Sequence, residues 1–127
     1  MTLTSVLAAV IQQDGNYLVC QRPAHKRHGN LWEFPGGKVE GGETHFEATR
    51  RELAEELDVR VLSVSSPIFA VADPEAEFLI EFVSTTIDGS PRCLEHTGLK
   101  WLSLADLPSL ELAPSDRRFV DFLLSAQ

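Results

Sequence analysis

The sequence has few cysteines and shows neither a membrane span nor a signal peptide. Its two cysteines, Cys20 and Cys93, stand far apart and form no CxxC pair, so they do not make a structural zinc site. Two free thiols in a reducing compartment are favoured over a disulfide, which the spacing would also allow. No apolar run approaches the ~20 residues of a membrane span, and the apolar start has no basic leader of the kind that signal peptides carry. We therefore expect a cytoplasmic protein without a membrane partner.

Positive charge is also scarce. Eleven Lys and Arg residues face nineteen Asp and Glu residues, which gives a net charge of −8. A protein that binds a polyanion normally shows an excess of basic residues, so a nucleic acid polymer is not an expected partner. A small phosphate substrate remains compatible, because a bound metal ion can reverse the local sign of the charge.

The chain of 127 residues, 43% of them hydrophobic, fits one domain over residues 1–127 with a core of its own. A turn at Asp14-Gly15 separates the first two predicted strands, and a turn of helix is expected at 104–107. The last helix should direct Phe119, Val120, Leu123 and Leu124 inward. Strands are predicted at 4–11, 16–21, 31–34, 60–71 (one bent strand or two short ones), 78–87 and 99–102, and helices at 44–57 and 114–124.

A glycine-rich turn over residues 36–43 leads into the first helix. Thr44 and Glu47 have the spacing of a capping box, in which a hydroxyl accepts an orphan backbone N–H and the glutamate reaches back. Phe46, Leu53 and Leu57 fall within about 40° of each other around the helix axis and predict its buried face.

Three carboxylates, Glu52, Glu55 and Glu56, share a different face of this helix. Like charges at this spacing destabilise a helix, so a sequence that needed only a helix would gain by replacing one of them. One interpretation is a solvated acidic face, and the other is a binding site for a cation. Glycine lacks a Cβ, so the preceding turn could approach a ligand closely. Oxygen ligands beside such a turn suit a hard divalent cation such as magnesium.

The turn and helix together resemble the Nudix box, which reads Gly, five residues, Glu, seven residues, Arg-Glu-aliphatic-x-Glu-Glu-x-Gly-aliphatic. One position departs from it, because Asp58 stands where the family has a glycine just past the helix end. Asp enters the left-handed conformation more readily than most residues, at a cost of around 1 kcal/mol. The matching residues are Gly37, Glu43, Arg51, Glu52, Leu53, Glu55, Glu56 and Val59.

The resemblance extends, with less specific matches at 31–34 and 112–116, to MutT-type members of the family. It implies an α/β fold, namely an α/β/α sandwich with a mixed β-sheet on which the box helix packs. It also implies Mg²⁺ as cofactor, with Mn²⁺ able to substitute. The expected metal ligands are Glu52, Glu55, Glu56 and the carbonyl of Gly36, and the expected catalytic residues are Glu55, Glu56 and Glu95.

Several of these roles have alternatives. Glu95 could ligate a second metal, act as general base, or be an ordinary loop glutamate. Gly37, Glu43 and Arg51 belong to the box as structural residues, with Glu43 and Arg51 as an ion pair that orients turn and helix. Trp101 and Phe78 are interpreted as core residues rather than as residues that stack on a base.

Three further positions are expected to contact a nucleotide. Arg22 is placed where MutT-like proteins have a phosphate-binding arginine, and its planar fork suits phosphate oxygens; otherwise it is a surface arginine. Lys38 could meet phosphate or remain solvated. Asp116 matches a base-reading position, although a helix cap would also explain it.

The activity that the resemblance implies is hydrolysis of a nucleoside triphosphate to the monophosphate and pyrophosphate by a monomer or weak homodimer. The nucleotide would be oxidised, like 8-oxo-dGTP, or would carry cytosine, like CTP or dCTP. The alternatives are a Nudix hydrolase of another nucleoside diphosphate derivative such as ADP-ribose, and a nucleotide-binding module without catalysis. An incomplete acidic triad would indicate the module, and this triad is complete.

Overall fold

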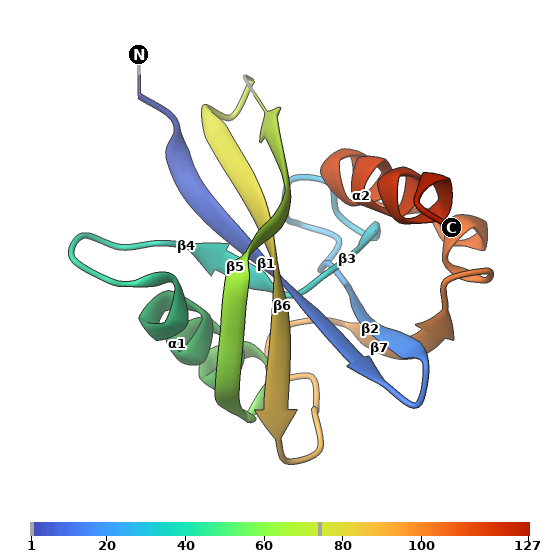
Figure 1. The fold of residues 1–127 in the computed structure, drawn as a ribbon, viewed down its shortest axis with the longest axis horizontal. Helices are drawn as coiled ribbons and strands as arrows, with labels where there is room; N and C mark the ends of the chain where they lie inside the picture. Colours follow the sequence, from blue (N-terminus) through green and yellow to red (C-terminus); the bar gives the residue numbers. More distant parts are fainter. Residues whose placement is uncertain (1, 74) are drawn as a thin grey trace.

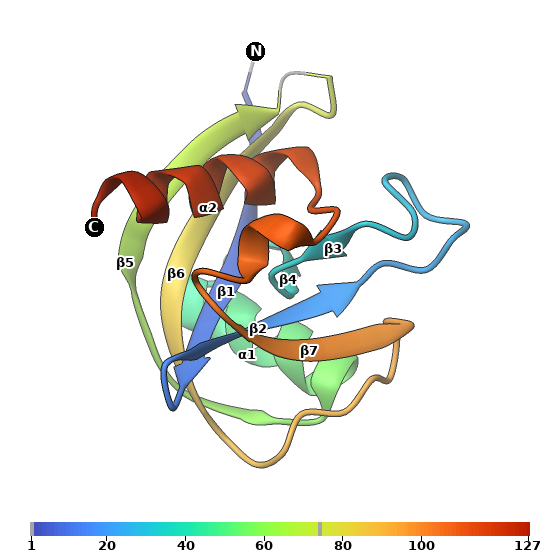
Figure 2. The same cartoon turned by 90° about the vertical axis from the view of Figure 1, so that its right-hand side faces the viewer.

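The computed structural model describes residues 2–73 and 75–127, and in that part of the chain a seven-stranded mixed sheet carries two α-helices (Figures 1 and 2). No described helix is both long and apolar enough to cross a membrane. The elements are β1 (Thr4–Gln13), β2 (Asn16–Gln21), β3 (Trp32–Glu33), β4 (Gly36–Lys38), α1 (His45–Leu57), β5 (Arg60–Asp73), β6 (Phe78–Asp88), β7 (Gly98–Ser103), the 3₁₀ turn η1 (Leu107–Ser109) and α2 (Pro114–Ser125).

The central strand β1 pairs in three ways. It runs parallel to β6 and antiparallel to β4, and its end continues through a tight turn at Asp14-Gly15 into the antiparallel strand β2. β2 in turn pairs with β3 and β7. β5 lies antiparallel to β6 with several register shifts, which makes it the bent strand that the sequence allowed. The sheet is mixed, as predicted.

Alternate residues of β1 belong to different cores. Ala9 and Ile11 pack in a cluster with Leu53 and Leu57 of α1. Ala8 and Val10 pack in another cluster with Phe119 and Val120 of α2. Because successive strand residues point to opposite faces, the two helices cover opposite faces of the sheet, as the predicted sandwich requires (Figure 2).

Aromatic contacts attach α2 to the sheet. The rings of Phe82 on β6 and Phe119 on α2 stack with centroids 4.4 Å apart, and Phe34 packs edge-on against Phe119 at 5.3 Å. Phe34 lies between β3 and β4, so this cluster also fixes the segment from which the glycine strand begins.

Both ends of α1 match the prediction. Thr44 and Glu47 form the capping box. Asp58 has φ 56° and ψ 44°, the left-handed conformation. Its carboxylate also accepts two hydrogen bonds from Arg92, at 2.7 and 3.0 Å, a contact that the sequence did not reveal.

Four local predictions were wrong. The expected glycine turn begins with the strand β4, because Gly36–Lys38 finds a free edge of β1 to pair with. Phe46 is 38% exposed, since Ala48 and Thr49 make the buried contact at that end of α1. Leu124 is also 38% exposed, one turn beyond the buried Phe119 and Val120. The helical turn forms at Leu107–Ser109 rather than at 104–107, with Pro108 inside it.

The two cysteines have different surroundings. Both thiols are free, with Cys20 of β2 buried in the cluster around Leu53 and Cys93 exposed. Burial is the main cause that raises the pKa of the Cys20 thiol far above its ordinary value, so this side chain is a packed apolar group rather than a nucleophile.

Candidate active site

Five glutamates line one cavity of about 440 Å³, which we call the acidic pocket: Glu33, Glu52, Glu55, Glu56 and Glu95. Three of them come from α1, and Gly36 borders the same cavity. The segment after β6 supplies Glu95, since the N–H groups of Arg92 and Leu94 donate to the last carbonyls of α1 at Leu57 and Glu56. The structure thus brings together the carboxylates that the sequence singled out and adds Glu33.

Arg51 links the turn before α1 to the helix itself. It donates to both carboxylate oxygens of Glu43, at 2.9 and 3.0 Å, and to Glu52 at 2.8 Å. The hydrogen bond from Arg51 is the main cause that lowers the pKa of Glu43 to about 2. The predicted ion pair is present, and it also orients one of the three candidate metal ligands.

The glycines of β4 make room for protein rather than for a ligand. A Cβ on Gly37 would collide with the carboxylate of Glu52, and a Cβ on Gly36 would collide with the backbone carbonyl of Leu7. Glycine at these positions therefore lets β4 lie flat between β1 and the acidic face of α1. The side chain of Glu52 rests directly on Gly37, which gives that position a physical reason to lack a side chain.

Glu56 is the buried member of the acidic pocket. Its side chain is 6% exposed, and its Oε2 atom has no hydrogen-bond partner. Burial, followed by the neighbouring Glu52, raises the pKa of Glu56 well above its ordinary value. A buried carboxylate among other carboxylates is unfavourable unless a proton or a cation neutralises it.

The donor set of the acidic pocket fits a divalent cation. Carboxylate oxygens and a backbone carbonyl are the ligands that hard cations prefer, and the unpartnered oxygen of Glu56 has a ligand's free lone pairs. Within residues 2–73 and 75–127, no three His, Cys, Asp or Glu side chains already stand at metal-ligand spacing. The arrangement is an acidic pocket rather than a finished coordination sphere.

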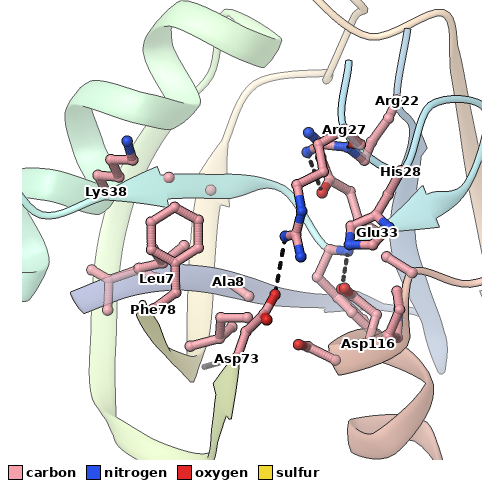
Figure 3. A pocket seen from close by; sticks show the side chains of 18 of the residues that line it. Leu7, Ala8, Arg22, Arg27, His28, Glu33, Lys38, Asp73, Phe78 and Asp116 are labelled. Atoms are coloured by element: carbon pink, nitrogen blue, oxygen red, sulfur yellow. Dashed lines mark hydrogen bonds and ion pairs between the residues drawn. The ribbon is translucent and has the colours of Figure 1, made fainter. Parts of the chain in front are cut away.

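A second cavity of about 540 Å³ adjoins the acidic pocket, and we call it the wide pocket (Figure 3). Its floor is apolar, with Leu7 and Ala8 of β1 and Ile80 of β6. Four cationic side chains border it. These are Arg22, Lys26, Arg27 and Lys38. The residues that line both cavities are Arg22, Lys26, Glu33 and Gly36.

Asp116 lies at the inner end of the wide pocket. It is buried, and its Oδ1 accepts a hydrogen bond of 2.8 Å from the backbone N–H of Phe34. The capping position of α2 is Ala113, and no side chain caps this helix, so Asp116 does not serve as the cap that the sequence left open. Burial, followed by the charge of Glu33, raises the pKa of Asp116 to about 8.

The two predicted phosphate-binding residues border the wide pocket. Arg22 directly follows β2 and donates to Glu33 at 2.9 Å and to the carbonyl of Arg27 at 2.7 Å. Lys38 is exposed on β4, with its amine 5.3 Å from the ring centre of Phe78. Phe78, at the start of β6, lines the pocket and belongs to no core cluster of the described residues, so its interpretation as a core residue was wrong. Trp101 packs on the cluster around Leu53, as predicted.

Sequence reasoning missed four residues of these pockets. Glu33 was predicted only as part of the strand at 31–34 and was given no role in the site. A charged residue between the aromatic Trp32 and Phe34 was the signal that could have revealed it. His96 directly follows Glu95 and was not considered. Arg27 and Asp73 form an ion pair of 3.0 Å across the mouth of the wide pocket (Figure 3), and no local pattern predicts a contact between segments so far apart in the chain.

Comparisons with known proteins place this geometry in a family. A family model described as the NUDIX domain matches residues 1–123. The chain is 34% identical to the CTP pyrophosphohydrolase of Escherichia coli strain K12 over 119 residues, which are 91% of this chain and 87% of that protein. It is 34% identical over 123 residues to a putative 8-oxo-dGTP diphosphatase 2 of Mycobacterium tuberculosis, with 91% and 84% coverage.

Solved structures agree with the sequence matches. A structure described as MutT from Aliivibrio salmonicida and Vibrio cholerae superposes with a TM-score of 0.84 at 26% identity, covering 99% of this chain and all of that one. The family model and the solved structure thus match almost the whole length of the chain. The matched region includes the sandwich, the capped box helix and the acidic pocket beside it. The chain belongs to the Nudix family, as a MutT-type hydrolase that acts on phosphoric anhydride bonds.

Proposed function

We propose that the protein hydrolyses a nucleoside triphosphate to the monophosphate and pyrophosphate with the help of a divalent cation, Mg²⁺ or in its place Mn²⁺. One observation carries the proposal. An acidic pocket that suits a cation adjoins a larger pocket with an apolar floor and a cationic rim, and the two share lining residues. A nucleoside triphosphate has the same polarity, with a flat, largely apolar base at one end and anionic oxygens at the other.

The residues would divide the work as follows. Glu52, Glu55, Glu56 and the Gly36 carbonyl would hold the cation in the acidic pocket. When bound there, the cation would neutralise phosphate charge and lower the pKa of a coordinated water. Arg22 borders both pockets and would bind phosphate oxygens with its planar fork, and Lys38 would add a second positive charge. Glu95 would accept the proton of the attacking water or serve as a further ligand.

Asp116 would read the base. Its Oδ1 already accepts from Phe34, so its second oxygen is the group left for a ligand. With a pKa of about 8, the carboxyl holds a proton at neutral pH and can donate as well as accept. A protonated Asp116 therefore suits a base edge with a carbonyl or ring nitrogen, which cytosine and oxidised guanine both have. The substrates proposed are CTP or dCTP and 8-oxo-dGTP.

A panel of nucleotides tests the proposal. CTP, dCTP, 8-oxo-dGTP, the ordinary triphosphates and ADP-ribose are incubated with the protein and Mg²⁺, and monophosphate, pyrophosphate and phosphate are measured separately. We expect pyrophosphate and the monophosphate from cytosine or oxidised-guanine triphosphates, and no turnover with a chelator. Stepwise release of phosphate, or turnover of ADP-ribose alone, would contradict it.

A further inference from the structure

His96 occupies an unusual place between the two pockets. Its side chain is only 5% exposed, and its Nε2 lies 2.9 Å from Oε2 of Glu33 and 3.7 Å from Oε1 of Glu56. Glu33 uses its other oxygen, Oε1, for Arg22 at 2.9 Å. One imidazole therefore stands between a carboxylate that contacts the phosphate-binding arginine and the buried carboxylate of the metal site.

The same part of the acidic pocket contains two buried polar atoms without a hydrogen-bond partner, Nδ1 of His96 and Oε2 of Glu56. Unpaired buried polar atoms are rare in folded proteins, and each calls for an explanation. A histidine retained only for packing would be expected to have both ring nitrogens satisfied. Its position between two carboxylates gives a reason for a polar ring here, because without the ring Glu33 and Glu56 would face each other as like charges.

We propose that His96 is a positioning residue, which holds the carboxylates of Glu33 and Glu56 in fixed relation so that the phosphate-binding arginine and the metal-binding carboxylate form one unit. This inference rests on the proposed metal site. His96 itself touches neither phosphate nor cation; it acts through the two glutamates. Residues that orient metal ligands typically change metal affinity by 10–100-fold when they are replaced.

Metal binding without nucleotide is the primary test. Calorimetry measures the Kd for Mn²⁺ in the wild type, His96→Ala and His96→Gln, and melting temperature is recorded without metal. We expect roughly a 10–100-fold weaker Kd for His96→Ala. His96→Gln should recover part of this loss, since its amide can donate to one carboxylate. His45→Gln is the matched control, because His45 also lies 3.7 Å from a glutamate, Glu81, and lines neither pocket.

Turnover separates positioning from packing. At saturating metal, we expect His96→Ala to lower kcat by more than about 10-fold and to change KM less. Combining it with Glu33→Gln should cost less than the product of the two single effects, because both changes break the same connection. An unchanged Kd for Mn²⁺ in both His96 variants would overturn the proposal, as would a fall in melting temperature with kcat per folded molecule unchanged.

The two proposals can fail separately. The Kd for Mn²⁺ is read without nucleotide, so a wrong substrate assignment leaves this test intact. If the wild type itself binds no Mn²⁺, the metal site is refuted and the role of His96 falls with it. If His96→Ala does not fold, the comparison of His96→Gln with His45→Gln decides the question.

Discussion

The acidic pocket and the wide pocket share a wall but are built in different ways. Three of the five glutamates of the acidic pocket come from α1, and Gly36 comes from the strand before it, so these candidate metal ligands are near neighbours in sequence. The wide pocket collects residues from β1, the loop after β2, β4, both strands of the β5–β6 hairpin and the start of α2. The candidate metal site is thus encoded locally, whereas the shape of the wide pocket depends on the whole fold. We therefore expect substitutions in the acidic pocket to change mainly kcat, and substitutions in the wide pocket to change mainly the preference among nucleotides.

The largest effect is expected for Glu56→Gln in the acidic pocket. The change keeps the shape and removes the buried negative charge, so kcat should fall by more than about 100-fold, beyond the range for residues that only orient a ligand. Stability without metal should hold or rise, since the amide is neutral in the buried site without needing a proton or a cation. Steady-state kinetics and thermal melting check both expectations. Glu111→Gln, at an exposed site outside both pockets, is the control; near-normal turnover of Glu56→Gln would remove Glu56 from the metal site.

Two neighbouring glycines sharpen the distinction between site and scaffold. In Gly37→Ala the new methyl would displace the flexible end of Glu52, so activity should fall by roughly 10-fold or more with a small change in melting temperature. In Gly36→Ala it would meet the backbone of β1, which cannot move aside, so stability should fall by about 1–3 kcal/mol. Denaturant unfolding and kcat are measured on both variants. Equal behaviour of the two would show that Glu52 is not held against Gly37.

Asp116→Asn tests whether the wide pocket sets selectivity. Near pH 7 a protonated carboxyl and an amide both donate, so the order of preference among CTP and 8-oxo-dGTP should change little. Above pH 8 the wild-type carboxyl is ionised and only accepts. The preferences should then diverge by about 1–3 kcal/mol in kcat/KM, with little effect on kcat for the best substrate. A uniform loss on all nucleotides at every pH would show that Asp116 does not read the base.

The raised pKa of Asp116 predicts that the free energy of unfolding depends on pH. Because burial raises the pKa of Asp116 from 3.8 to about 8, the folded state keeps a proton that the unfolded chain has lost. Its contribution to stability is full below about pH 4 and is lost as pH rises to about 8. Asp116→Asn does not titrate, so its melting temperature relative to the wild type should rise over this interval. A constant difference would mean that the carboxyl is already ionised at neutral pH.

The smallest effect is expected at Asp58, which lines neither pocket. The sequence alone predicts that Asp58→Gly is stabilising by up to about 1 kcal/mol, because glycine adopts the left-handed conformation without penalty. The structure adds an exposed ion pair with Arg92, worth about 0.2–1 kcal/mol, which the variant loses. We therefore expect a net change within about 0.5 kcal/mol and unchanged activity. Arg92→Ala isolates the ion pair, and a loss above 1 kcal/mol in Asp58→Gly would show that the pair dominates.

Sequence reasoning was most successful where contacts are short in range. The capping box at Thr44 follows from spacing, whereas the left-handed Asp58 and the pairing of Glu43 with Arg51 follow from the resemblance to the Nudix box. All of these residues lie in α1 or close to its ends. Sequence reasoning failed at β4, whose pairing partner lies in β1, and at Phe78, which lines a pocket formed by segments far apart in the chain. The ion pair of Arg27 with Asp73 joins the loop after β2 to the end of β5, which only the folded sheet brings together.

The parallel pairing of β1 with β6 has a consequence for how the chain folds. Strand β1 cannot complete its hydrogen bonds until β6, far downstream in the chain, has been synthesised, because Thr4 pairs with Phe78 and Ile11 with Thr85. Until then, an apolar strand that belongs at the centre of the sheet is left without its neighbour. Such long-range pairing slows folding relative to helical proteins of similar size and lengthens the exposure of aggregation-prone segments. Refolding of this small hydrolase should therefore be slower than its length alone suggests.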